Sequence, residues 1–430
     1  MTDISQYFPT RGATTPMWSF GTEAAAKVDF RQLAQSGANS VIIDFQLRVS
    51  SLSGSRVSWG DSTVTDGDLK EAITLAGEAG LKVWLKPIVQ IGNQGLNWQQ
   101  LDPTSKQTFF SEYDTKILQA LKQDAHGYVS NILLSNELTD LTTNPGNIGY
   151  WQTLIDKIHA ARPDLLVGFN AMGLMGDPPG QSEFERIPDA LYSLVNFVGI
   201  SAYPVINAKT VQGFENGWHH DQFGIDQVQV MLNFFSRNSL PIFFTELGSR
   251  YQHGGQQFPQ GASADAAFFD ASFKVISQEL SSRVAGVFPY AWMLNDNDFT
   301  NVPWQQWGLN EKPEVRGILA DWFSGHENQF IFDSVPGSQI EGITGFRRGL
   351  DKIVLFHADF RGIGPIGHLL AAADFHIGVH ATTHSQHIIY NPHTGFLFYD
   401  PDGSGHMPQI HFATVNAHLA PSNMDFLVLP

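Results

Sequence analysis

Short apolar runs alternate with amphipathic stretches along roughly the first three quarters of the chain. The runs cover residues 16–21, 40–49, 81–89, 131–135, 165–169, 196–203, 241–245 and 286–293. Hydrophobicity within them is continuous rather than alternating, which is typical of strands that are buried on both faces of a parallel sheet. The pattern therefore favours strands covered by helices on either side.

The stretches between these runs have the spacing of amphipathic helices. In residues 66–79 the apolar positions recur at helical intervals, and Gly80 follows as a stop signal. Similar spacing is found in residues 105–123, 148–162, 226–237, 264–280 and 312–322. Eight strand–helix units predict a (β/α)₈ TIM barrel. A doubly wound open sheet would give the same alternation, but no glycine-rich phosphate loop follows the first run, which disfavours that fold.

The pattern changes near residue 327. Helical periodicity fades, turn residues become frequent, and short strand-like runs appear at 329–332, 353–356, 386–390 and 395–399. Eleven of the 16 histidines lie between His326 and His418. We therefore predict a barrel domain over residues 1–324, followed by a small β-rich C-terminal domain over residues 325–430.

Composition narrows the function classes. Acidic residues outnumber Lys and Arg by 42 to 25, and the basic residues form no run. A nucleic-acid partner is therefore not expected, because nothing would neutralise its phosphates. The absence of cysteine excludes disulfides, cysteine-ligated zinc and thiol catalysis.

The beginning of the chain is polar. Residues 1–15 contain no apolar segment of the kind found in N-terminal signal peptides. The chain also lacks any continuous apolar stretch of about 18 residues, so we expect no membrane insertion.

Two glutamates each follow directly on an apolar run. Glu137 comes after the fourth run and Glu246 after the seventh. In a barrel, the carboxyl ends of the strands carry the active site. Two carboxyl groups about 5–5.5 Å apart are what retaining glycoside hydrolysis requires: one attacks the anomeric carbon, and the other acts first as acid and then as base. A single strand-end glutamate could equally be a helix cap or an ion-pair partner, so the pairing carries the prediction that Glu137 and Glu246 are catalytic.

Asn136-Glu137, Glu246 and Trp292 resemble the pattern of clan A glycoside hydrolases. The stretches at 81–87 (LKVWLKP), 150–151 (YW), 198–204 (VGISAYP), 241–248 (PIFFTELG) and 312–313 (KP) are similar, more narrowly, to the family-113 group, known chiefly as endo-β-1,4-mannanases. This resemblance covers roughly residues 14–324. It implies that Glu137 is the acid/base and Glu246 the nucleophile of a retaining, endo-acting enzyme. The implied substrate is a β-linked polysaccharide or oligosaccharide, with β-1,4-mannan preferred, and no cofactor is required.

Other readings remain open. The same barrel could hydrolyse another β-glucan or a bacterial exopolysaccharide. A secreted, non-catalytic carbohydrate-binding protein could also use the barrel as a scaffold. The presence of both carboxylates argues against this last reading, because losing either one would remove the chemistry.

Three residues near the pair have predicted roles in substrate binding. Tyr203 is expected to hydrogen-bond Glu246 and keep it ionised and oriented. Trp292 would offer an apolar face under the sugar, and Asn136 would hold the sugar 2-hydroxyl. The alternatives are a tyrosine that marks a strand end, a core tryptophan and a turn asparagine.

Lys86 lies within an apolar strand pattern. Because burying an unpaired ammonium is costly, we expect it to reach the site and bind substrate or a carboxylate. Gln46 and Asn170 are further polar candidates. Aromatic residues on loops could form a sugar-stacking rim or simply pack, and these are Trp18, Trp59, Trp98, Trp218, Trp304 and Trp307.

The C-terminal segment shows a second resemblance. Residues 330–333, 343–346, 349–354 and 388–405 resemble the terminal part of RTX-type modules. Such modules imply export by type I secretion machinery with an uncleaved C-terminal signal, and hence an extracellular location; a cytoplasmic location is the alternative. The glycine-rich calcium repeats of those modules are absent here, although Asp400 and Asp402 could hold one structural calcium. A plain Asp-Gly turn is the alternative for these two residues.

Histidines at 376, 380, 384 and 387 have a spacing that invites a transition-metal site. The segment is strand- or loop-like rather than helical, so this spacing does not place the rings on one face. We predict solvated surface histidines and no metal site.

Overall fold

The structure is a computed structural model that describes residues 8–60, 66–92, 98–175, 179–249, 251–253, 256–258, 262–294, 308–310, 312–324, 329–332, 335–337, 340–343, 346, 351–415 and 421–430. The chain divides into two compact units, Asp3–Gly325 and His326–Pro430. Within the described residues, no helix combines the length and the apolar character that a bilayer crossing needs.

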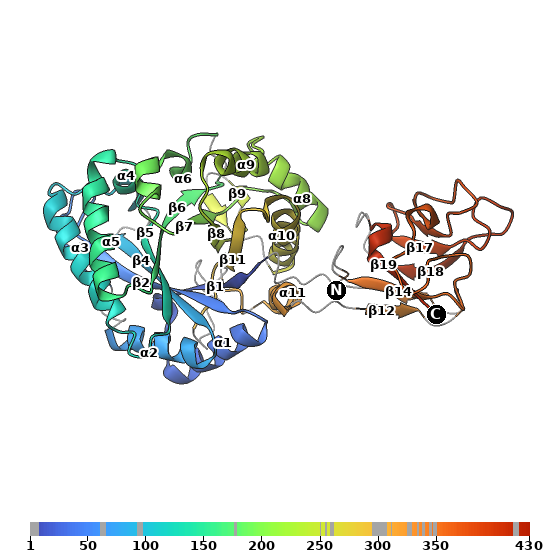
Figure 1. The fold of residues 1–430 in the computed structure, drawn as a ribbon, viewed down its shortest axis with the longest axis horizontal. Coiled ribbons are helices and arrows are strands. Elements are labelled where there is room, and N and C mark those ends of the chain that lie inside the picture. The colour runs from blue at the N-terminus through green and yellow to red at the C-terminus, as the bar shows by residue number, and fades with distance from the viewer. Residues whose placement is uncertain are drawn as a thin grey trace. The chain divides into compact units, whose positions relative to one another are not determined.

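The first unit is a closed barrel of eight parallel strands, as predicted, with helices around it (Figure 1). Neighbouring barrel strands follow one another in chain order, and the last pairs with the first. The strands are β1 (Thr10–Pro16), β2 (Ser40–Val49), β4 (Lys82–Ile91), β5 (Val129–Asn136), β6 (Leu166–Gly173), β7 (Phe197–Ala202), β8 (Ile242–Leu247) and β11 (Val284–Pro289). The fourth and seventh barrel strands are therefore β5 and β8.

The longer helices of this unit are α1 (Glu23–Gln35), α2 (Asp66–Glu78), α3 (Lys106–Leu121), α5 (Ile148–Ala161), α8 (Val211–His219), α9 (Gln227–Arg237), α10 (Ala262–Val275) and α11 (Pro313–Ser324). Short elements lie in the connections: β3 (Ser58–Trp59), β9 (Tyr251–His253), β10 (Gln256–Phe258), α4 (Thr139–Thr142), α6 (Glu183–Arg186) and α7 (Asp189–Tyr192). Side-chain caps begin several helices; Ser105, for example, accepts the Thr108 N–H at the start of α3. Helices α1 and α8 were not among the predicted ones.

The predicted position of the first strand, residues 16–21, is wrong. Strand β1 ends at Pro16, where the prediction began. It carries glycine, alanine and threonine rather than large apolar residues, so it lacks the usual signal. The small residues have a packing reason, because a Cβ at Gly12 would lie 1.9 Å from the carbonyl oxygen of Ser40 on β2. Close approach of β1 to β2 thus removes the pattern that marks the other strands.

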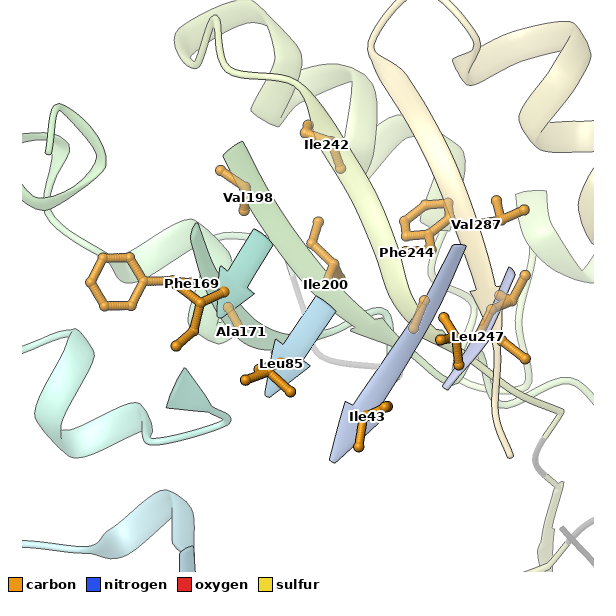
Figure 2. Packing of buried hydrophobic residues seen from close by; sticks show 14 of the residues in the cluster. Ile43, Leu85, Phe169, Ala171, Val198, Ile200, Ile242, Phe244, Leu247 and Val287 are labelled. Carbon is orange, nitrogen blue, oxygen red and sulfur yellow. The ribbon is translucent and has the colours of Figure 1, made fainter. Parts of the chain in front are cut away.

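Alternate residues of the strands face the helices and the barrel interior. On β2, Val41, Ile43 and Phe45 belong to the core between strands and helices. Figure 2 shows this packing, with Ile43 on β2, Leu85 on β4 and other strand residues labelled. The opposite faces contribute a separate interior cluster, made of Ile42, Trp84, Leu133, Phe197, Phe243 and Phe288. The Trp84 ring packs at its centre, with centroids 5.0–5.1 Å from three phenylalanine rings.

One layer farther along the strands, the barrel interior becomes polar. Asp44 follows Ile42 by two residues on β2, and Lys86 follows Trp84 by two residues on β4, so each pair shares a face. Both polar side chains are buried. The apolar cluster therefore fills the interior layer nearer the amino ends of the strands, and the charged layer lies next to it, nearer their carboxyl ends.

The second unit is rich in β-structure, with two sheets around a core of its own that includes Phe332, Ile353, Phe412 and Phe426. A three-stranded parallel sheet joins β12 (Gln329–Phe332), β14 (Lys352–Phe356) and β19 (Phe426–Leu429). A five-stranded mixed sheet joins β13 (Glu341–Gly342), β18 (Ile410–Thr414), β17 (Phe396–Tyr399), β16 (Ile388–Tyr390) and β15 (Phe375–Ile377).

Candidate active site

Glu246 points into the barrel because β8 loses its regular register. Ile200 of β7 pairs with Phe244, yet the next residue, Ser201, pairs with Glu246, so two residues of β8 oppose one of β7. Regular alternation would send Thr245 inward and Glu246 outward. With the shift, both side chains contact interior residues. An extra residue of this kind commonly re-aims a side chain beside an active site.

A similar shift precedes Glu137. Between the pairs Leu133–Gly168 and Asn136–Asn170, β5 advances three residues while β6 advances two. Glu137 itself has φ 54°, in the left-handed backbone region that residues other than glycine rarely adopt. It is only 6% exposed. A strained glutamate at the end of a barrel strand is the kind of backbone outlier that occurs at functional sites.

Glu246 has two strong partners. The Tyr203 hydroxyl donates to one carboxylate oxygen at 2.6 Å, as predicted from the sequence. The Lys86 ammonium donates to the other oxygen. Lys86 is completely buried, so the expectation that it would reach a carboxylate is met by this contact. Together the two donors stabilise the negative charge of Glu246 and fix both of its oxygens.

Lys86 also contacts a second carboxylate, that of Asp44. The two residues are direct register partners on β2 and β4, and the ammonium lies 3.2 Å from Asp44 Oδ1. Burial raises the pKa of Asp44 to about 8; Lys86 opposes that rise and Glu246 adds to it. Burial lowers the pKa of Lys86, but the charges of Asp44 and Glu246 outweigh it and raise that pKa above its usual value. One buried cation thus lies between two acids, and Asp44 was not among the predicted site residues.

Glu137 has Gln99 as a neighbour. The side-chain amide of Gln99, in the turn Trp98–Gln100, lies 3.4 Å from one carboxylate oxygen. Gln99 was not predicted, since a polar residue on a loop carries no signal of its own. The backbone N–H of Glu137 donates to the Asn170 carbonyl at 3.0 Å.

A buried glutamate supports the segment that follows Glu137. Glu183 accepts the hydroxyls of Thr139 and Thr142 at 3.0 and 2.6 Å, and the backbone N–H of Met172 at 2.9 Å. Burial raises the pKa of Glu183 to about 7 despite these hydrogen bonds, and the charge of Glu137 contributes to the rise. Glu183 therefore ties α4 to β6 and lies within electrostatic reach of Glu137.

Asn136 and Asn170, both predicted site residues, contact each other. The Asn170 amide nitrogen donates to Asn136 Oδ1 at 2.6 Å and to Ser201 Oγ at 2.9 Å, while Thr245 donates to its oxygen. Asn170 is completely buried, so its side chain is committed to these neighbours. The contact turns the oxygen of Asn136 toward Asn170 and leaves its amide nitrogen on the other side.

Tyr290 is a neighbour that the sequence analysis missed. It follows β11, and its ring centroid lies 6.3 Å from that of Tyr203. Burial first, and then the charges of Glu246, Asp44 and Glu137, raise the pKa of Tyr290 well above its usual range. Its hydroxyl is therefore neutral among the three acids. Its position directly after the eighth barrel strand was the one sequence feature that could have indicated a place in the site.

The remaining predicted residues are placed less favourably for substrate contact. Trp292 is 1% exposed, and its indole N–H donates to the Asp29 carbonyl at 3.0 Å, so its ring packs in the core. Trp218 is likewise buried, within α8 rather than on a loop. Gln46 is buried, with no hydrogen-bond partner for its side-chain oxygen among the described residues. The Trp18 and Trp98 side chains and the whole of Trp304 and Trp307 lie outside the described residues.

Comparison with known proteins decides the family. The model of Glycoside Hydrolase Family 113 matches residues 10–299, which is more than half of the chain. The chain belongs to glycoside hydrolase family 113. It is therefore a glycoside hydrolase, of a retaining family in clan A, whose substrate is a polysaccharide or oligosaccharide.

Solved structures agree with the fold of this enzyme. A complex of a family-113 β-1,4-mannanase matches it with a TM-score of 0.56 and 18% identity, over 73% of this chain and 98% of that one. The family-113 β-mannanase AaManA from Alicyclobacillus acidocaldarius, in complex with ManMIm, matches with a TM-score of 0.56 and 20% identity, over 73% and 96%. At this identity the likeness shows the fold alone. The enzyme matches none of the curated proteins with which it was compared.

No group of three or more His, Cys, Asp or Glu side chains that could hold a metal is found within the part of the enzyme that the structure describes. At the predicted calcium position, the Asp402 carboxylate accepts the backbone N–H groups of His406 and Met407. These hydrogen bonds lower the pKa of Asp402, Met407 contributing most. Its contacts are those of a turn residue.

A cavity of about 420 Å³ lies on the outside of the enzyme's barrel, between α3 and α5. Its lining includes Phe110, Asp114, Tyr150 and Lys157, and none of the acids inside the barrel or their hydrogen-bond partners. Because barrel enzymes carry their chemistry at the strand ends, the acids inside the barrel and not this hollow define the candidate site.

Proposed function

We propose that the enzyme hydrolyses β-1,4-mannan at internal linkages, with net retention of anomeric configuration. In this proposal Glu246 is the nucleophile and Glu137 is the general acid/base. The observation that carries it is the pair of donors on Glu246: an ammonium and a phenol hydroxyl each donate to one oxygen of this carboxylate and fix its orientation at the carboxyl end of a barrel strand.

The reaction would run in two steps. Glu246 attacks the anomeric carbon while Glu137 gives its proton to the leaving oxygen, which forms a covalent glycosyl-enzyme. Glu137 then takes a proton from water, and that water releases the sugar. Asn136 would hold the sugar 2-hydroxyl with its amide nitrogen, and Asn170 would keep that amide in place. No cofactor takes part in either step.

The substrate is inferred from relatives. The two solved structures described above are β-mannanases, and the sequence stretches near the strand ends resemble the same group. Mannan is thus the first substrate to test. Screening mannans, β-glucans and bacterial exopolysaccharides distinguishes it from the alternatives. A fall in viscosity that runs ahead of reducing-end release would support endo action.

Replacing the nucleophile tests the assignment. We expect Glu246→Gln to lower turnover roughly a thousandfold or more, since it removes the covalent step. The exposed Glu78 at the end of α2 provides the matched control Glu78→Gln, which should leave turnover unchanged. NMR of the first products should show the β-anomer. Unchanged turnover by Glu246→Gln, or an initial α-product, would contradict the proposal.

Azide separates the roles of the two acids. With a substrate that has an activated leaving group, azide should restore turnover to both alanine variants by filling the space left by the side chain. Glu246→Ala should then yield the α-glycosyl azide, by direct attack, and Glu137→Ala the β-azide, by attack on the covalent intermediate. The opposite outcome would exchange the two assignments.

For the second unit, we propose a role in export or attachment outside the cell, as its RTX-like stretches suggest. Deleting roughly the last 60 residues should then abolish secretion through a type I system, while hydrolytic activity in lysates persists. Undiminished secretion of the truncated chain would exclude this role.

A further inference from the structure

Asp44 is a buried acid for which the proposed reaction has no use. It lies on β2 in the charged layer, 1% exposed. Among the described residues, neither of its carboxylate oxygens accepts a hydrogen bond of good geometry. Its close partner is the Lys86 ammonium, 3.2 Å away on β4. An acid in such a position is expensive to keep unless it compensates another charge.

The charges around Asp44 come from several strands. Lys86 faces it from β4, Glu246 from β8 and Glu137 from the end of β5, while the neutral Tyr290 faces it from the end of β11. On the other side, its register partner on β1 is the uncharged Pro16. Lys86 is thus the cation of this group, and two acids contact it directly.

The covalent step changes this balance. While Glu246 is a carboxylate, it neutralises Lys86, and its negative charge disfavours a second charge on Asp44. This agrees with the pKa of Asp44, which burial raises to about 8 and to which Glu246 contributes. Once Glu246 becomes a neutral ester, the buried ammonium loses its anion, and an ionised Asp44 is the group positioned to replace it.

We propose that Asp44 is a positioning residue that serves as the alternate counter-ion of Lys86, and that it releases its proton to solvent when Glu246 becomes glycosylated. This inference rests on the proposed role of Glu246 as nucleophile. In this scheme the Lys86 ammonium keeps an anionic partner in both halves of the cycle, Glu246 in the resting enzyme and Asp44 in the covalent intermediate. Deglycosylation returns the charge to Glu246, and Asp44 takes a proton back.

The test counts protons during formation of the covalent intermediate. In the Glu137→Gln variant, 2,4-dinitrophenyl β-mannobioside esterifies Glu246: the Oε–C1 bond forms, and the C1–O bond breaks with its electron pair leaving on dinitrophenolate. That leaving group needs no proton, so the chemistry itself neither takes up nor releases one. The yellow phenolate reports the number of esters formed, and a pH indicator in weak buffer reports protons from the protein.

We expect release on the order of one proton per ester at about pH 6–7.5, falling toward zero above about pH 9, where Asp44 is already ionised in the resting enzyme. Adding Asp44→Asn to Glu137→Gln should abolish the release. If the double variant fails to fold, the pH dependence of proton release in Glu137→Gln alone still tests the inference.

Each outcome decides something different. Peptide mapping locates the adduct first. An ester on Glu246 without proton release at about pH 6–7.5, or with equal release in the double variant, overturns the inference and leaves the proposed function intact. The probe carries the sugar that wild type hydrolyses in the substrate screen. If dinitrophenolate is released but no ester maps to Glu246, the nucleophile assignment fails, and this inference fails with it.

Discussion

The surroundings of Glu246 and Glu137 differ in a way that matches two separate chemical tasks. Glu246 accepts a hydrogen bond on each of its oxygens, one from the buried Lys86 ammonium and one from the Tyr203 hydroxyl. Glu137 has a side-chain amide at 3.4 Å, and a second carboxylate, Glu183, lies within electrostatic reach. A buried cation contacts Glu246, whereas the charged group near Glu137 is another acid, Glu183, whose pKa burial raises to about 7.

This difference shows how one barrel can give two like side chains different surroundings. A nucleophile has to be ionised before attack, whereas a general acid has to arrive with its proton. A cation favours the charged form of a carboxylate, and a nearby carboxylate favours the neutral form. The environments are therefore consistent with Glu246 as nucleophile and Glu137 as acid/base. Three substitutions would break or sharpen the comparison.

The largest effect is expected from Lys86→Met. Removing the ammonium leaves Asp44 and Glu246 buried without their cation, and breaking a buried ion pair costs about 3–5 kcal/mol of unfolding free energy. We also expect kcat/KM to fall on the order of 100-fold, because Glu246 loses its main electrostatic support. Chemical denaturation and steady-state kinetics on an activated glycoside measure the two effects.

Lys82, at the exposed start of the same strand, offers a matched control. Lys82→Met should change the unfolding free energy by no more than about 0.5 kcal/mol. Equal stability and activity of the two methionine variants would show that the charge on Lys86 does not matter.

A smaller effect, dependent on pH, is expected from Glu183→Gln. The pKa of Glu183 is raised from 4.5 to about 7 by burial, so its contribution to stability is fully present below pH 4.5 and is lost as pH rises through about 7. Wild type should lose roughly 3 kcal/mol from this group over that range. Glutamine keeps the shape but cannot ionise, so the slope should flatten.

Unfolding free energies measured across this pH range, with Glu78→Gln as control, test the slope. An identical pH dependence in Glu183→Gln and wild type would mean that Glu183 does not titrate in this range. The same variant sharpens the contrast between the two acids, since above about pH 7 it removes a negative charge near Glu137 and leaves the contacts of Glu246 untouched.

The smallest effect is expected from Gln99→Ala. The contact at 3.4 Å is long for a hydrogen bond, so we expect a loss of less than about 1 kcal/mol in transition-state stabilisation, or a few-fold in kcat/KM. Gln100→Ala, the exposed neighbour in the same turn, is the control. A loss greater than about 100-fold would place Gln99 among the main supports of Glu137.

Prediction from the sequence succeeded where a residue breaks a strong pattern. Lys86 is a charge inside an apolar strand, and this was enough to infer a buried partner. Asp44 carries the same signal on the neighbouring strand and was overlooked, although adjacent opposite charges in a parallel barrel are expected to meet. Tyr203 was predicted to bind Glu246 from its place at a strand end. Gln99 and Glu183 had no such signal, because they lie in short connecting segments that come near Glu137 only in the folded barrel.

Trp292 shows the opposite case. It comes shortly after the last barrel strand, where a sugar platform was expected, yet its ring is buried against the helices. Tyr290, two residues earlier, lies near the acids instead. Spacing along the chain could not distinguish the two, because the side to which each ring turns depends on how the end of β11 leaves the barrel.

The alternation of apolar runs and amphipathic helices determined the barrel, because strands buried on both faces need continuous hydrophobicity and their helices need only one apolar side. It also placed both glutamates at the carboxyl ends of strands. The direction of each side chain was decided only in three dimensions. The extra residues in β5 and β8 reverse which side chains point into the barrel. The register between two strands depends on how they pair, so it cannot be read from the sequence of either strand alone.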